Sequence, residues 1–132
     1  DINAMIHTHT TFAATISCLR WNLPAVHYLV AFGGTDIRCA DYATYGTVAL
    51  AKNAYKAMEG RKAVLLANHG LLAGGANLAE AFSVTEEIEF CCELYYRTKG
   101  IGEPVILPQD EMERMVERFK NYGKRTEEHE EI

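Results

Sequence analysis

A single stretch decides the fold: AVLLANHGLLAGG, residues 63–75. Its first part, residues 63–67, is continuously apolar, and such a run predicts a strand that is buried on both faces. Gly70 and the pair Gly74-Gly75 bracket a second short apolar run, residues 71–73. This spacing predicts a hairpin return rather than a crossover to a parallel strand. We therefore expect a sheet that is mostly antiparallel.

Strands and helices alternate on both sides of this hairpin. The chain as a whole predicts a strand, a helix, a short strand, a helix, the hairpin, a long helix and a last amphipathic helix. Glycine, proline and asparagine separate these elements, and no internal repeat or linker interrupts them. The order indicates an α/β sandwich with a sheet core. Outside the hairpin, the expected elements are residues 2–7, 12–19, 37–40, 47–58 and 78–98, and a helix that starts at Asp110.

Three of these helices have expected faces. Residues 47–58 carry apolar side chains at helical spacing, namely Val48, Ala51, Tyr55 and Met58. The last helix directs Met112, Met115, Val116 and Phe119 inward. In the long helix, glutamates form a solvated face that comprises Glu86, Glu87, Glu89 and Glu93.

Length and composition fit one domain. The 132 residues are 48% hydrophobic, and we expect a domain over residues 1–126 with a flexible acidic tail over 127–132. A net charge of −5 argues against nucleic acid as the main partner, because phosphate contacts need clustered Lys and Arg. No apolar run reaches the roughly 20 residues that a membrane helix needs. The four cysteines show no C-x-x-C spacing, so reduced, buried thiols in a cytoplasmic protein are expected.

Three histidines have the spacing of a metal site. His7 and His9 are two residues apart on a predicted strand, so their side chains share a face. His69 ends another predicted strand and is followed by Gly70. Three imidazoles around a tetrahedral ion leave the fourth position open, as in catalytic zinc sites. The open position would allow Lewis-acid chemistry on a substrate oxygen.

Simpler interpretations stand beside this one. A His-x-His pair is common, and the three histidines could be ordinary polar residues at strand ends. His27 is expected to be hydrogen-bonded in the core, and His129 to be solvated in the acidic tail. Tyr28 and Tyr122 could act as general acids, but a packing role is the more frequent one for a tyrosine.

The motifs together resemble the class II aldolase/adducin family, and within it the L-fuculose-1-phosphate aldolase branch. The resemblance runs nearly end to end and covers the C-terminal, larger part of the family's domain. The stretch YATYGT is the feature most typical of the fuculose branch. The motifs are HTH at 7–9, LPAVHY at 23–28, IRCADYATYGT at 37–47, NHGL at 68–71 and RFKNYG at 118–123.

The resemblance implies a three-layer α/β/α sandwich and a zinc ion held by His7, His9 and His69. It implies cleavage of L-fuculose 1-phosphate to dihydroxyacetone phosphate and L-lactaldehyde, with zinc stabilising an enediolate. Tyr28 would donate a proton to the aldehyde oxygen, and Tyr122 would close over the site. The family is usually a cyclic homotetramer with active sites between subunits, so both tyrosines would serve a neighbour's metal.

The family domain also has a segment ahead of the His-x-His strand. That segment carries the glutamate that acts as acid and base and the groups that bind the substrate phosphate. We expect this chain to be the C-terminal, metal-bearing portion of such an enzyme, and to be inactive without that segment. Two alternatives remain: a sugar-phosphate 4-epimerase or dehydratase of the same family, and a non-catalytic adducin-like interaction domain, which would lack the metal site.

Overall fold

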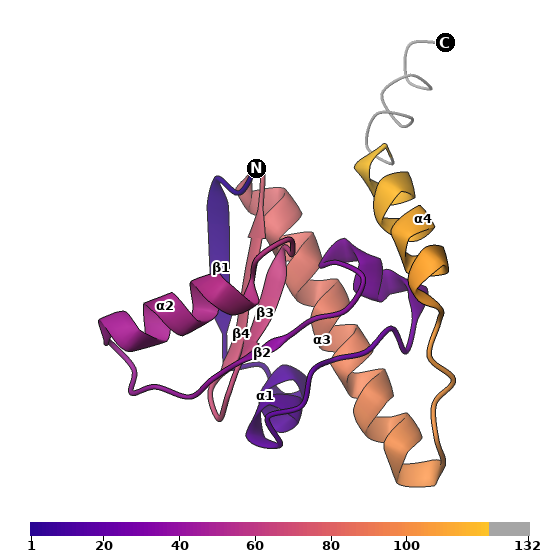
Figure 1. The fold of residues 1–132 in the computed structure, drawn as a ribbon, viewed down its shortest axis with the longest axis horizontal. Coiled ribbons are helices and arrows are strands. Elements are labelled where there is room, and N and C mark those ends of the chain that lie inside the picture. Colours follow the sequence, from indigo (N-terminus) through magenta and orange to yellow (C-terminus); the bar gives the residue numbers. More distant parts are fainter. Residues whose placement is uncertain (122–132) are drawn as a thin grey trace.

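The computed structural model describes residues 1–121. Tyr122, His129 and the expected boundary at residue 126 lie outside these residues. Figure 1 shows a central sheet with helices on both sides. The described elements are β1 (Ala4–Thr8), α1 (Thr11–Cys18), the 3-10 helix η1 (Tyr28–Phe32), β2 (Cys39–Ala40), α2 (Val48–Ala57), β3 (Ala63–Leu66), β4 (Gly70–Gly75), α3 (Leu78–Ile101) and α4 (Gln109–Lys120).

The sheet has the strand order β1-β4-β3-β2. The β3–β4 hairpin is antiparallel, with Ala63 opposite Ala73, as the stretch 63–75 predicts. Strand β1 pairs antiparallel with β4, and only the short β2 joins in parallel, beside β3. The prediction of a mostly antiparallel sheet is confirmed. The pairing of β1 with β4 brings the first residues of the chain to the hairpin.

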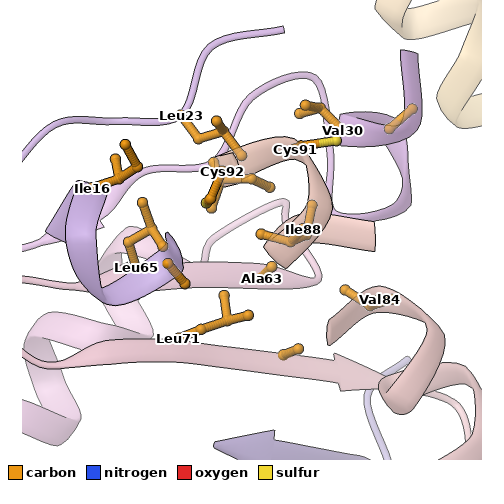
Figure 2. Close-up of a cluster of buried hydrophobic side chains, with 14 of the residues drawn as sticks. Ile16, Leu23, Val30, Ala63, Leu65, Leu71, Val84, Ile88, Cys91 and Cys92 are labelled. Atoms are coloured by element: carbon orange, nitrogen blue, oxygen red, sulfur yellow. The ribbon is translucent and has the colours of Figure 1, made fainter. Parts of the chain in front are cut away.

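The apolar run in β3 is continuous because both faces of the sheet are covered. Ala63 and Leu65 face a core shared with α1, η1, α3 and α4, whereas Val64 and Leu66 face a smaller core under α2. Figure 2 shows the larger core, where Ile16 of α1 and Ile88 of α3 approach Leu65 and Leu71 of the sheet. These two cores are the interfaces of a three-layer α/β/α sandwich, and the expected fold is confirmed.

The expected face of α2 is wrong in part. Val48 is 71% exposed and Tyr55 is 85% exposed, while Ala54 and Met58 are buried. Helix α2 has two apolar stripes, and the one that meets the sheet contains alanines. Small side chains let a helix approach a sheet closely, and periodicity alone does not tell which stripe does so.

The cysteines fit their prediction unevenly. Cys91 and Cys92 are fully buried in α3, and burial raises the pKa of Cys91 to about 12. Cys39 is half-buried, but Cys18 is exposed at the end of α1, against the expectation of a buried thiol. All four thiols are free. Among the described residues, no helix is both long and apolar enough to cross a membrane.

Two isoleucines of α3 test this packing. Ile88 is fully buried between the sheet and η1, whereas Ile101 is 91% exposed at the end of the same helix. We expect Ile88→Ala to lower the free energy of unfolding by about 2–5 kcal/mol, because it opens a cavity. Ile101→Ala should change it by less than about 0.5 kcal/mol. Urea titrations of both variants give the comparison, and equal losses would contradict the assigned core.

Candidate metal centre

His7 lies on the face of the sheet that α2 only partly covers. In the pairing of β1 with β4, His7 is opposite Leu72, and cross-strand partners share a face. Leu72 packs against the core under α2, but α2 itself packs on β2 and β3. The side chains of His7 and His9 are therefore exposed beside that helix layer.

The structure brings the three predicted histidines together. Nε2 of His7 lies 3.1 Å from Nε2 of His9 and 3.1 Å from Nε2 of His69. One ring nitrogen from each histidine lies within 4.8 Å of the other two. A tetrahedral zinc site with Zn–N distances of about 2.0–2.1 Å separates its ligand nitrogens by about 3.3–3.4 Å. The observed spacing is close to that geometry.

Hydrogen bonding leaves the facing nitrogen of His7 without a proton. Its Nδ1 lies 2.9 Å from the carbonyl oxygen of Leu71, a position that only an N–H can satisfy. Nε2 of the neutral ring then presents a lone pair to the other two rings. Burial lowers the pKa of His69, as would positive charge on His7 or His9, so the neutral form of His69 is favoured. Converging lone pairs on neutral imidazoles fit a divalent cation, with His7 oriented by the backbone as metal-ligating histidines usually are.

A short turn holds His69 against the end of α1. Asn68 has a positive φ of 54°, a conformation that asparagine tolerates better than most residues. Its backbone N–H donates to the carbonyl of Ser17 at 3.0 Å, and Arg20 donates to its side-chain oxygen at 2.9 Å. The fully buried Ser17 also accepts from the N–H of His69 at 3.3 Å. The sequence analysis did not identify these residues, although an asparagine directly before His-Gly is a signal for such a turn.

Gly70 permits the close approach of β1 to this turn. A Cβ atom at Gly70 would lie 2.2 Å from the carbonyl oxygen of Thr8. Thr8 stands between His7 and His9, so any side chain at position 70 would displace the His-x-His segment from His69. The glycine after His69 therefore has a structural reason that concerns the site directly.

Tyr28 lies apart from the three histidines. It begins η1, which packs on α3 and α4, and its ring stacks on His27 at 4.7 Å and lies 6.3 Å from Phe119. The side chain is 46% exposed. His27 caps η1 by accepting from the N–H of Leu29 at 3.1 Å, which agrees with the expected hydrogen-bonded role. Tyr122 lies outside the described residues.

The fold and the histidine cluster agree with the comparison to known families. The family described as "Class II Aldolase and Adducin N-terminal domain" matches residues 1–96. This match covers more than half of the chain, and it includes all three histidines. The chain belongs to the class II aldolase and adducin family.

Individual relatives carry aldolase names. The chain is 58% identical over 123 residues to the 5-deoxy-D-ribulose 1-phosphate aldolase of Bacillus thuringiensis serovar kurstaki, with 93% of this chain and 58% of the relative covered. It is 42% identical over 130 residues to the L-fuculose phosphate aldolase of Escherichia coli strain K12, covering 97% and 60%. A solved structure titled "L-fuculose 1-phosphate aldolase" has 60% identity and a TM-score of 0.90, covering 91% and 57%. The chain thus spans less than two thirds of the length of these relatives.

Two histidines separate metal binding from general packing. We expect His69→Ala to reduce bound divalent metal to background, because it removes one of three ligands. His27→Ala is the matched control, since His27 caps η1 and should leave the metal content unchanged. The measurement is elemental analysis after equilibration with zinc and gel filtration. Retention of stoichiometric zinc by His69→Ala would contradict the assignment, and absence of metal from the unmodified protein would support an adducin-like domain.

Proposed function

We propose that the complete protein is a metal-dependent aldolase that cleaves a 1-phosphorylated ketose to dihydroxyacetone phosphate and an aldehyde. The observation that carries the proposal is the convergence of Nε2 atoms from His7, His9 and His69, with two of the three side chains exposed. Three imidazoles are the donor set of catalytic zinc sites. We therefore propose zinc as the metal.

The chain's own residues hold the cation and leave it accessible. When bound, a divalent cation supplies Lewis-acid stabilisation of the negative charge that develops on substrate oxygens as a carbon–carbon bond breaks. His7 is oriented by the carbonyl of Leu71, and His69 by the turn that Ser17 anchors. This preorganisation keeps the ligand atoms in place before substrate arrives, which is a requirement for efficient electrostatic catalysis.

Tyr28 is the proposed proton donor to the aldehyde oxygen in the condensation direction. Its half-exposed ring is held against His27 and Phe119, so its hydroxyl group is available at the surface. Because it packs on the α3 and α4 side of η1, we propose that it serves the histidines of a neighbouring subunit in a homo-oligomer. Tyr122 follows α4 and is proposed to close over the same intersubunit site.

Two substrates are supported by the relatives. The Bacillus relative is named for 5-deoxy-D-ribulose 1-phosphate, and the Escherichia coli relative for L-fuculose phosphate. Cleavage between C3 and C4 releases dihydroxyacetone phosphate from both, and the aldehyde is acetaldehyde in the first case and L-lactaldehyde in the second. We propose 5-deoxyribulose 1-phosphate as the first candidate, on the higher of these two identities, and L-fuculose 1-phosphate as the second.

A cleavage assay tests the reaction and the substrate together. The full-length, zinc-loaded protein is given each ketose phosphate, and dihydroxyacetone phosphate and the aldehyde are measured separately. We expect equimolar release of both products, faster from the preferred substrate, and no release by His69→Ala. Consumption of ribulose 5-phosphate to its 4-epimer, with no cleavage of either 1-phosphate, would overturn the aldolase proposal in favour of an epimerase.

Mixing two inactive variants tests the position of Tyr28. In the full-length protein, Tyr28→Phe should retain zinc and lower kcat about 10²–10⁴-fold, the usual contribution of a proton-transfer group. Co-assembly of Tyr28→Phe with His69→Ala should restore about a quarter of normal activity, because one intersubunit site in four then has both residues. Each variant assembled alone is the control. No recovery on co-assembly would place the tyrosine and the histidines of one site in the same subunit.

A further inference from the structure

Glu89 of α3 does not belong to the solvated face that the sequence analysis expected. It is half-buried, and its two carboxylate oxygens accept hydrogen bonds from backbone N–H groups of α1. Phe12 donates to Oε1 at 2.6 Å, and Ala13 donates to Oε2 at 3.1 Å. By contrast, Glu86 is exposed and Glu93 pairs at the surface with Arg97 at 2.7 Å.

Helix α1 has no local cap that could replace these bonds. Thr10 occupies the N-cap position, but its side chain makes no capping hydrogen bond, and the first turn contains no acidic residue. The hydroxyl of Thr10 lies instead 3.1 Å from the hydroxyl of Thr8. The first N–H groups of a helix need acceptors, and a carboxylate also complements the positive end of the helix dipole. Glu89 supplies both from a position 77 residues away along the chain.

The segment fixed in this way contains a metal ligand. His9 lies between Thr8, which pairs with Leu71 of β4, and Thr10, which begins α1. Backbone and Ser17 contacts orient His7 and His69, as described above. Among residues 1–121, by contrast, the one hydrogen-bond-range neighbour of the His9 ring is Nε2 of His7. The placement of His9 therefore depends on its two backbone neighbours, and one of them depends on Glu89.

We propose that Glu89 is a positioning residue of the metal centre, which sets the place of His9 relative to His7 and His69 by fixing the first turn of α1. The proposal rests on the metal-binding role of these histidines in the proposed function. Glu89 touches neither metal nor substrate in this account. It acts through the backbone of Phe12 and Ala13.

The test compares cobalt binding in variants of the full-length protein. Co²⁺ is the probe because its visible spectrum reports the geometry of its ligands. Glu89→Gln keeps the size of the side chain but turns one acceptor oxygen into a donor that faces an N–H group, and Glu89→Ala removes both acceptors. Glu86→Gln is the matched control, because it removes a charge from an exposed position of the same helix. Circular dichroism establishes that each variant is folded.

We expect both Glu89 variants to bind Co²⁺ about 10–100-fold more weakly than the unmodified protein, as is usual when a group that orients a metal ligand is removed. Their spectra should shift, while those of Glu86→Gln should not. A folded Glu89→Gln variant with unchanged affinity and spectrum would overturn the proposal, and so would a failure of the unmodified protein to bind Co²⁺. Weakened Co²⁺ binding in the Glu89 variants, with no ketose phosphate cleaved by the unmodified protein, would support the proposal while overturning the proposed reaction.

Discussion

The antiparallel pairing of β1 with β4 is the constraint on which the site depends. It places His7 opposite Leu72 and aligns the end of β1 with the turn that carries His69. The two strands can meet there because Gly70 has no side chain to collide with the carbonyl of Thr8. Once this register is set, three imidazole nitrogens from two distant segments converge without any further rearrangement of the backbone.

Helix α1 then connects the two halves of the site. It has only eight residues, and a helix this short depends on tertiary contacts for its stability. Its end near His69 is joined to the turn through Ser17, and its beginning near His9 is held by Glu89 of α3. The long helix on the far side of the sheet thereby influences the histidines, although none of its side chains points at them in these contacts.

The parts of this arrangement that follow from local pattern could be predicted from the sequence. The His-x-His spacing on a strand, the strand-terminal His69 and the hairpin at 63–75 are local features, and each recurs in the structure. The carboxylate cap by Glu89 joins residues 77 positions apart, so no periodicity could indicate it. The buried stripe of α2 depended on the shape of the sheet beneath it. The place of Tyr28 relative to a metal depends on contacts between chains, which a single sequence does not encode.

Because the ligands lie 62 positions apart, a cation held by them would act as a cross-link between the first strand and the hairpin. A ligand that binds only the folded chain stabilises it by mass action, by about 4 kcal/mol at a free concentration 1,000 times Kd. The same cross-link closes a long loop that the unfolded chain would otherwise keep open, at an entropic cost that rises only slowly with loop length. Metal supply in the cell would then set how long the folded protein persists, as well as how fast it works.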